Sequence, residues 1–356
     1  MKIAFFSGGI NRSGGTERVL SIIANGLAER GYEVIILSLT GEGPTFYALD
    51  EKIKVYWIGS KGLETNIISN LRKLDKIMKS EKPDFLIDVD IILCFYSILL
   101  KIKYPKTHWI SWEHFNFFSE FSTNRNLRKI ARFLVSRFSE CLVVLSDEDK
   151  GYYQDNMRLK CHIRRIYNPL PYKKSYQKEK EKKIVLAAGR LVHIKGFDML
   201  LKSWRPVEKK HPDWILRIAG DGEEKDALKG LAERLGLKNV EFAGLIEDME
   251  TEYREAAFFA LSSRNEGIGM VLLEAMNFSI PAIAFACKAG VSEVIKDGVN
   301  GYLVPPGRLK TYSRKIDRMI SRYDERHQMG IAAKEMLDKF KQEKILDEWE
   351  RLFEES

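Results

Sequence analysis

The chain is predicted to be an α/β protein in which two Rossmann-like, doubly wound domains face a central cleft. Three observations predict this fold class. The length of 356 residues suits two medium-sized domains better than one. Short apolar segments alternate with amphipathic segments in both halves, a pattern typical of parallel sheets covered by helices. The alternation breaks once, at a polar segment with two prolines that has the composition of a linker.

The predicted N-terminal domain, residues 1–168, begins with an apolar strand and a glycine-rich loop that leads into a helix over residues 16–31. Its other expected strands share short runs of branched and aromatic side chains. The strands of this domain are expected at residues 2–6, 33–39, 84–89, 107–112 and 141–146. The linker is placed at residues 169–183.

The predicted C-terminal domain, residues 184–335, shows the alternation more clearly. Its expected strands lie at residues 183–189, 214–220, 239–244, 258–263 and 282–286, with helices between them. The last segment, residues 336–356, is predicted to form a helix that packs back towards the N-terminal domain. Ile345, Trp349 and Leu352 share one face of that helix.

Composition excludes several classes of protein. No run of about 18 apolar residues exists, so no membrane-spanning helix is expected. The four cysteines lie far apart without a CxxC pair, which argues against a disulfide framework or a zinc site. No nucleic-acid-binding motif accompanies the net charge of +8, so no nucleic acid partner is expected. The N-terminus lacks the long apolar core of a signal peptide, and a cytoplasmic protein is therefore predicted.

A basic amphipathic helix is predicted over residues 124–138. Its apolar residues fall on one face, at Leu127, Ile130, Leu134 and Phe138. Basic residues surround the rest, at Arg128, Lys129, Arg132 and Arg137. One interpretation is a surface helix with a solvated basic side. The other is peripheral docking on anionic lipid headgroups, at the inner face of the plasma membrane.

Two cations follow the first strand of the C-terminal domain, in the segment "GRLVHIKG". Arg190 offers a planar fork of donors and Lys195 a compact point charge, a combination that suits a phosphate group. Gly189 and Gly196 flank them. The alternative is a pair of ordinary surface charges.

Two glutamates, Glu266 and Glu274, flank the start of a helix in "NEGIGMVLLEAM". Gly267 and Gly269 would let the backbone approach a ligand, and a helix from about Met270 would point free N–H groups at a diphosphate. Carboxylates on either side would then accept hydrogen bonds from sugar hydroxyls. This is the layout of a nucleotide sugar. The alternative is a helix with one exposed acidic residue.

Together these segments resemble glycosyltransferase family four, the retaining enzymes of GT-B fold. The two glutamates match the E-x7-E signature of that family, and "IPAIAFA", "IAGDGEEKDALKGLAERLGL" and "VEFAGL" extend the resemblance. In the N-terminal half, "SGGTERVL" and "WEHFN" look like members that extend bacterial surface polysaccharides, lipopolysaccharides or lipid-linked oligosaccharides. Where related enzymes often carry proline, "CKAGVSE" has none, which leaves the sugar harder to predict.

The resemblance implies a role for each matching residue. The implied catalytic residues are His114, Glu266, Arg190 and Lys195. The implied donor-binding residues are Gly189, Arg190, Lys195, Leu245, Glu266, Gly267, Ile268, Gly269, Met270, Val271 and Glu274. Gly14 and Gly15 would form a loop on the acceptor side. His114 would lie beside the reacting sugar, although a lone histidine is more often structural.

The implied reaction is transfer of a hexose or N-acetylhexosamine from a nucleotide diphosphate, with UDP expected, to a hydroxyl of a glycan or polyprenyl-diphosphate-linked acceptor. No metal cofactor is expected, because two cations and a helix N-terminus would stabilise the leaving diphosphate. "DVD" at Asp88–Asp90 imitates a metal motif of a different transferase fold but lacks the rest of its pattern.

Three alternatives remain open. A UDP-sugar epimerase or a phosphorylase would use the same architecture. A non-catalytic nucleotide-sugar binder would bind donor without turnover. A dinucleotide-dependent oxidoreductase fits poorly, because "GGINRSGG" does not match the GxGxxG fingerprint.

Overall fold

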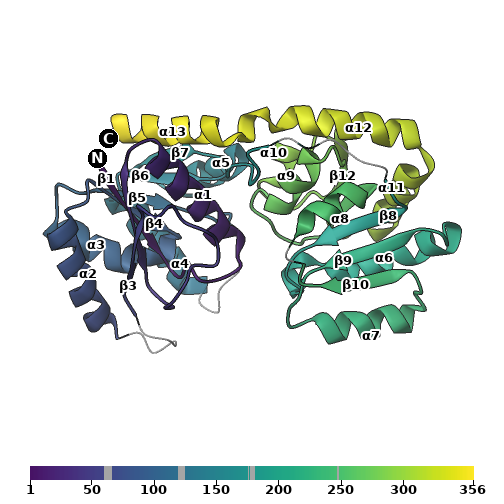
Figure 1. The fold of residues 1–356 in the computed structure, drawn as a ribbon, viewed down its shortest axis with the longest axis horizontal. Coiled ribbons are helices and arrows are strands. Elements are labelled where there is room, and N and C mark those ends of the chain that lie inside the picture. The colour runs from purple at the N-terminus through teal and green to yellow at the C-terminus, as the bar shows by residue number, and fades with distance from the viewer. Residues whose placement is uncertain (60–65, 119–124, 175, 177–180, 247) are drawn as a thin grey trace. The chain divides into compact units, whose positions relative to one another are not determined.

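The computed structural model describes residues 1–59, 66–118, 125–174, 176, 181–246 and 248–356 (Figure 1). Parts of two predicted segments lie outside these residues, namely Asn124 of the basic helix and residues 175 and 177–180 of the linker. The chain divides into two compact units. The first comprises residues 1–171 with residues 340–356, and the second comprises residues 172–339.

The first unit contains a seven-stranded parallel sheet in the order β3-β2-β1-β4-β5-β6-β7. Its strands in chain order are β1 Lys2–Ser7, β2 Glu33–Ser38, β3 Lys54–Trp57, β4 Phe85–Val89, β5 His108–Trp112, β6 Cys141–Val144 and β7 His162–Arg165. The central strands are buried along nearly their whole length, as expected for a parallel sheet covered on both faces. Both edge strands are half-exposed, and neither β3 nor β7 was predicted.

Helices connect these strands and cover the sheet (Figure 1). They are α1 Gly15–Glu29, α2 Ile67–Glu81, α3 Cys94–Lys103, α4 Arg125–Phe138, α5 Asp147–Asn156 and α13 Gln342–Glu354, with a short 3₁₀ helix η1 at Ile91–Leu93. Apolar side chains of α2 and α3, among them Leu74, Met78 and Leu100, pack on β1, β2 and β4.

The second unit contains a six-stranded sheet in the order β10-β9-β8-β11-β12-β13, also parallel throughout. Its strands are β8 Ile184–Ala188, β9 Ile215–Ala219, β10 Val240–Gly244, β11 Phe258–Leu261, β12 Ala282–Phe285 and β13 Gly301–Val304. Its helices are α6 Phe197–Lys210, α7 Lys225–Leu235, α8 Met249–Glu255, α9 Met270–Asn277, α10 Val291–Val294, α11 Leu309–Ser321 and α12 Tyr323–Glu335, with 3₁₀ helices η2 His193–Lys195 and η3 Met336–Phe340.

Each sheet has the strand order of a Rossmann fold. The first three strands of each unit are added from the centre towards one edge, and the later strands are added from the centre towards the other edge. The prediction of two Rossmann-like α/β domains is therefore confirmed. All ten predicted strands are present, with bounds within two residues of those expected. No helix among the residues that the structure describes has the length and apolarity needed to cross a membrane.

The C-terminal helix α13, yellow in Figure 1, belongs to the first unit. Trp349 is fully buried, and its ring meets Trp112 of β5 edge-on, with centroids 4.9 Å apart. Leu346 packs against Gly26 of α1, where an added Cβ would lie 2.5 Å from the Leu346 Cδ1. The missing side chain at Gly26 thus allows α13 to approach α1.

The predicted orientation of the basic helix, now α4, is wrong. Arg128 and Arg132 were expected on a solvated side, yet they are only 5% and 8% exposed. Ala131 and Val135 complete the buried face, while Leu127 and Ile130 are exposed. The reason is that both arginines find partners inside the unit, as described below, and paired charges tolerate burial.

Replacing Trp349 tests how strongly α13 holds the first unit together. Trp349→Ala should lower the free energy of unfolding of that unit by about 3–5 kcal/mol, because it empties a buried aromatic site. Hydrogen-exchange mass spectrometry in urea would show faster exchange in β1, β4 and β5 with β8 and β11 unchanged. Glu354→Ala, at the exposed end of α13, is the control. Equal protection in wild type and Trp349→Ala would contradict this packing role.

Candidate functional site

The strand order of the second sheet reverses between β8 and β11, which are hydrogen-bonded neighbours. In open α/β sheets, the loops after two such strands leave towards opposite faces and open a crevice at their carboxyl ends. The loop after β8 carries Arg190 and Lys195, and the loop after β11 carries Glu266. The fold therefore brings the predicted cations and the first predicted glutamate to the same edge of the sheet.

Lys195 and Glu266 meet directly across this reversal. The Lys195 Nζ lies 2.5 Å from the Glu266 Oε1, although 71 residues separate them in the chain. Ser263 Oγ donates to the same carboxylate oxygen at 2.8 Å. The Lys195 side chain keeps 27% exposure while that of Glu266 keeps only 8%. A half-exposed ammonium is therefore held over a nearly buried carboxylate.

The two loops also fit closely through their backbones. Gly196 begins α6 in the left-handed region, with φ of +66°, and a Cβ there would lie 2.1 Å from the carbonyl oxygen of Ser262. Ser262 Oγ in turn donates to the carbonyl oxygen of Lys195 at 2.9 Å. Only glycine permits this approach, and the approach fixes the height of Lys195 above the β11 loop.

Arg190 differs from Lys195. Its side chain is exposed, and no described residue forms a hydrogen bond or ion pair with its guanidinium. Gly189, directly before it, has a φ of +151° and lies next to the Lys195 side chain. The loop after β8 thus presents one guanidinium open to solvent and one ammonium paired with a carboxylate.

The start of α9 lies in the same loop as Glu266. Gly269 is its N-cap, with φ of +73°, and Met270 and Val271 are half-buried in its first turn. Ile268 is buried. Gly290 approaches from the "CKAGVSE" loop, and a Cβ there would lie 1.7 Å from the carbonyl oxygen of Gly267. This glycine-rich entry is therefore held by backbone-to-backbone contact.

The second glutamate is more enclosed than expected. Glu274 is 4% exposed and accepts a hydrogen bond of 2.7 Å from the Tyr253 hydroxyl of α8. Leu245, which follows β10, is by contrast 68% exposed. The structure therefore buries Glu274 against α8 and leaves Leu245 on the surface.

In the first unit, the predicted residues lie at the carboxyl edge of its own sheet. Gly14 is the N-cap of α1 with an extended backbone, and Gly15 is the first helical residue. The loop that contains them follows β1, which pairs with β4 where this sheet reverses.

His114 follows β5 and is 8% exposed. Its ring lies against Trp112, with centroids 4.3 Å apart. Burial lowers the pKa of the His114 imidazole to about 3, so the ring is neutral at physiological pH. Its Nε2 is buried without a hydrogen-bond partner among the described residues. A buried ring nitrogen without a partner in the described protein is able to bond to a water molecule or a ligand.

A buried charge network beside His114 was not predicted. The Arg128 Nη2 of α4 lies 2.6 Å from Asp90 Oδ2, and its Nη1 lies 3.2 Å from Glu113 Oε2. The same guanidinium stacks 4.6 Å from the centroid of the Phe115 ring. Glu113 also accepts the Phe115 backbone N–H at 3.0 Å. Arg128 therefore contacts the residues directly before and after His114, namely Glu113 and Phe115.

A second arginine extends the network one turn further along α4. Arg132 Nη2 donates to the Asn116 carbonyl oxygen at 3.5 Å, and its guanidinium lies 4.9 Å from the Phe117 ring centroid. Asp149 of α5 accepts the Phe117 backbone N–H at 2.7 Å. The i, i+4 spacing of the two arginines was the available signal, because it places both on one helical face.

The two aspartates of "DVD" have separate partners. Asp88 is fully buried and accepts hydrogen bonds from Trp109 Nε1, at 2.8 Å, and from the Ser97 hydroxyl. Asp90 pairs with Arg128. Burial raises the pKa of the Asp88 carboxyl to about 8 and that of Glu113 to about 7. Both aspartates therefore hold the first unit together.

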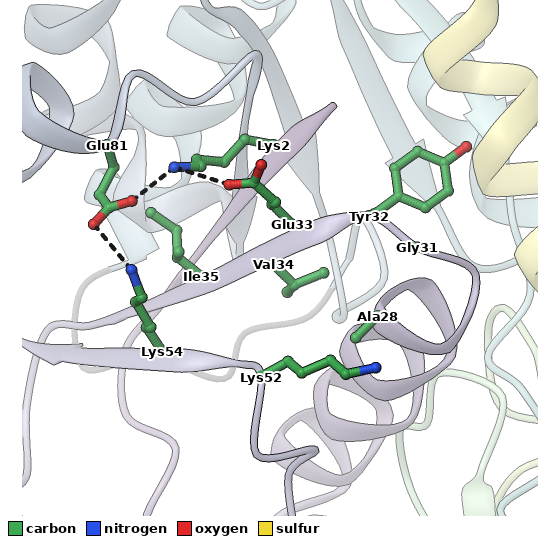
Figure 2. A pocket seen from close by; sticks show the side chains of 10 residues that line it. All are labelled: Lys2, Ala28, Gly31, Tyr32, Glu33, Val34, Ile35, Lys52, Lys54 and Glu81. Atoms are coloured by element: carbon green, nitrogen blue, oxygen red, sulfur yellow. Dashed lines mark hydrogen bonds and ion pairs between the residues drawn. The ribbon is translucent and has the colours of Figure 1, made fainter.

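A separate hollow of about 360 Å³ lies at the opposite end of the first sheet (Figure 2). Lys2, Glu33 and Lys54 stand at the amino ends of β1, β2 and β3, and Glu81 ends α2. Lys2 pairs with Glu33 and Glu81, and Lys54 approaches Glu81, so these charges satisfy one another. Ligands of open α/β sheets bind at the carboxyl ends, so the candidate site is not here.

The fold is that of a class of α/β proteins with two Rossmann-like domains. Residues 171–336 match the family model "Glycosyl transferases group 1", and residues 13–173 match "Glycosyltransferase Family 4". An uncharacterized glycosyltransferase of Haemophilus influenzae is 34% identical over 98% of both chains. The chain therefore belongs to this glycosyltransferase family and is a glycosyltransferase of GT-B fold, which confirms the resemblance.

Two further proteins are similar over their full length. One is the α-1,4-N-acetyl-D-galactosaminyltransferase of Campylobacter jejuni named for GalNAc-α-(1→4)-GalNAc-α-(1→3)-diNAcBac-PP-undecaprenol, which is 30% identical over 100% of this chain and 99% of its own. The other is a solved structure of an S. aureus TarM variant in complex with fondaparinux, α-GlcNAc-glycerol and UDP. It superposes with a TM-score of 0.87 at 17% identity, covering 99% of this chain and all of TarM, and so shows the shared fold.

Asp88 should make stability depend on pH. Its folded pKa of about 8 exceeds the ordinary value of 3.8, so the folded state binds the extra proton between these pH values. The free energy of unfolding should then fall as pH rises, with Asp88 contributing up to about 1.4 kcal/mol per pH unit below pH 8. Asp88→Asn should remove this slope, because asparagine resembles the protonated carboxyl and does not titrate.

Urea unfolding of the full chain from pH 5 to pH 8 measures this difference. His114 titrates in the opposite sense, but it is present in both proteins and cancels from the comparison. Asp155→Asn, at an exposed position of α5, should keep the wild-type profile. Parallel curves for wild type and Asp88→Asn would show that Asp88 is ionised in the folded protein.

Proposed function

We propose that the protein transfers a hexose or N-acetylhexosamine from a UDP-sugar to a hydroxyl of a glycan or lipid-linked glycan in the biosynthesis of a cell-surface polysaccharide. One observation carries the proposal. Lys195 and Glu266 meet at 2.5 Å where the strand order reverses, beside the exposed guanidinium of Arg190 and the start of α9. Cations, helix N–H donors and a carboxylate together match the parts of a nucleotide sugar.

The difficult step is departure of the nucleoside diphosphate, because negative charge develops on the leaving oxygen. Arg190, Lys195 and the first N–H groups of α9 would stabilise that charge, and one such donor is typically worth roughly 3–4 kcal/mol. We propose that these groups suffice without a metal ion. The two aspartates of the DVD segment, Asp88 and Asp90, are engaged with Trp109, Ser97 and Arg128.

Donor binding would exchange partners at the ion pair. When a phosphate oxygen takes the Lys195 ammonium, the Glu266 Oε1 loses that partner and becomes an acceptor for a sugar hydroxyl. Glu274, buried against Tyr253, would accept the ribose hydroxyls. The proposed retention of anomeric configuration follows the family resemblance. In that course the departing phosphate oxygen takes the acceptor proton.

The acceptor side of the proposal rests on His114 and on the relatives. The unsatisfied Nε2 of a neutral imidazole accepts or donates one hydrogen bond, which suits orientation of a hydroxyl. The name of the Campylobacter relative specifies an acceptor on a polyprenyl diphosphate, and the TarM structure holds UDP. The name of the Campylobacter relative supports a lipid-linked acceptor, and the TarM structure supports a UDP-sugar donor.

Slow hydrolysis of donor tests the proposal without knowledge of the acceptor. A panel of nucleotide sugars, followed by mass spectrometry, should give hydrolysis of one UDP-sugar. Lys195→Ala and Glu274→Ala should each lower that rate at least a hundredfold or so while the protein stays folded. Lys202→Ala, on the exposed side of α6, is the matched control. Full activity in both site variants would reject the assignment.

The variant His114→Phe distinguishes a role of the His114 ring in the reaction from a role in packing. Phenylalanine fills the same space against Trp112, and the lost Nε2 has no hydrogen bond within the described protein, so stability should not fall. Transfer to an acceptor should fall roughly a hundredfold or more if Nε2 contacts substrate. Thermal unfolding and transfer assays measure the two effects. Unchanged transfer with unchanged stability would make the ring a packing residue.

A further inference from the structure

Tyr253 of α8 and Glu274 of α9 form a buried pair in the second unit. The Tyr253 hydroxyl donates to Glu274 Oε2 at 2.7 Å, and the two residues are 0% and 4% exposed. A carboxylate at this depth is costly unless donors satisfy its oxygens. An apolar residue would fill the same place without that cost, as the neighbouring Leu273 and Ala275 do.

Helical geometry directs Glu274 towards the start of α9. Glu274 follows Met270 by four residues and Val271 by three, so these three side chains share one face of the helix. Side chains of a helix tilt towards its N-terminus, which brings the carboxylate over the first turn. Met270 and Val271 are only half-buried, whereas the two leucines that follow them are fully buried. Glu274 therefore belongs to the least buried side of α9, at the end where the diphosphate is proposed to bind.

The ring of Tyr253 is packed among other aromatic rings. Its centroid lies 5.5 Å from that of Phe278, at an interplanar angle of 26°, and 6.3 Å from that of Phe259 in β11. Phe278 is stacked in turn on Tyr176, with centroids 4.5 Å apart. The Arg254 guanidinium lies 5.1 Å from the Tyr176 centroid. A ring packed in this way keeps its hydroxyl in one place.

A fixed hydroxyl gives the Glu274 carboxylate a fixed orientation. Glutamate is a long, flexible side chain, and a hydrogen bond to one of its oxygens removes much of that freedom before a ligand arrives. A carboxylate oriented in advance accepts hydroxyl donors at defined positions. When a ligand lacks one of these hydroxyls, the buried carboxylate loses a partner, so the site discriminates against that ligand.

We propose that Tyr253 is a positioning residue for Glu274 and that the pair makes the site selective for ribonucleoside diphosphates over their 2′-deoxy counterparts. This selectivity rests on the proposed function, in which Glu274 accepts the ribose hydroxyls. Tyr253 does not touch the nucleotide, but it holds the carboxylate where the 2′-hydroxyl reaches it. Sugar donors built on deoxythymidine diphosphate lack that hydroxyl and bind weakly for the same reason.

Calorimetric titration of the full chain with UDP and with dUDP tests the proposal, because the two ligands differ only in the 2′-hydroxyl. Wild type should bind UDP roughly tenfold more tightly than dUDP, which is the worth of one hydrogen bond to a charged group. Tyr253→Phe keeps the stacked ring and removes only the hydroxyl. It should weaken UDP binding about tenfold and leave dUDP binding nearly unchanged, so that most of the preference is lost.

Tyr312→Phe is the matched control. Tyr312 is also fully buried in the second unit, but its hydroxyl donates to the backbone carbonyl oxygens of Leu261 and Ile283, at 3.1 and 3.0 Å. Loss of this hydroxyl should lower the thermal stability without changing the ratio of UDP to dUDP affinity. Equal weakening of both ligands by Tyr253→Phe would overturn the positioning role, because it would reveal a general loss of structure.

The variant Glu274→Gln provides a second route to the same conclusion. Glutamine keeps the shape of glutamate but not its charge, so this variant alone should lower the preference for UDP. Adding Tyr253→Phe should lower the preference no further, because the Tyr253 hydroxyl acts only through the carboxylate. Additive losses in the double variant would contradict the proposal.

The wild-type protein separates this proposal from the proposed function. Equal affinity for UDP and dUDP would overturn the selectivity and leave the function standing. A preference for UDP without hydrolysis of any UDP-sugar would reject the proposed transfer and leave the selectivity standing. Binding of neither nucleotide would reject both.

Discussion

The reversal of strand order in each sheet is the constraint on which the rest depends. Where β8 and β11 lie side by side, their following loops leave in opposite directions, so no crossover covers the ends of the two strands. Lys195 and Glu266 come from these loops and meet across the gap. Gly196 allows these two loops to meet backbone to backbone, and Gly290 brings the loop after β12 against the loop after β11 in the same way. The strand order therefore brings the two loops together, and the opposite charges of Lys195 and Glu266 then form the ion pair.

In the first unit, buried charged side chains hold the loop that carries His114. Asp90 and Glu113 follow β4 and β5, and Arg128 of α4 pairs with both of them. Asp149 of α5 accepts the backbone N–H of Phe117 at the far end of the same loop. Breaking one partner of a buried ion pair typically costs about 3–5 kcal/mol, since it leaves the other charge unpaired. The loop of His114 is thus stiffened at the expense of a fully apolar core. Because arginines occupy the inward face of α4, larger apolar side chains of that helix are left exposed.

Much of the fold was readable because strands buried on both faces appear as unbroken apolar runs, as in β6 and β12. Three edge strands, β3, β7 and β13, were not predicted. β3 and β7 are only partly buried, and their sequences, "KVYW" and "HIRR", carry charge. Motifs identified Lys195 and Glu266, but not their contact, since nothing in a sequence joins residues 71 positions apart. For α4, the helical pattern identified an apolar side and a basic side. It did not show which of the two sides is buried. The carboxylates of Asp90 and Glu113 decide that, and they come from other loops.

A crystal structure with UDP would test the central claim most directly. The account predicts the diphosphate within hydrogen-bond distance of Lys195 and the first turn of α9, with the Lys195 Nζ drawn away from Glu266 Oε1 and Arg190 ordered on a phosphate. UDP bound elsewhere, with the Lys195–Glu266 ion pair intact, would contradict it.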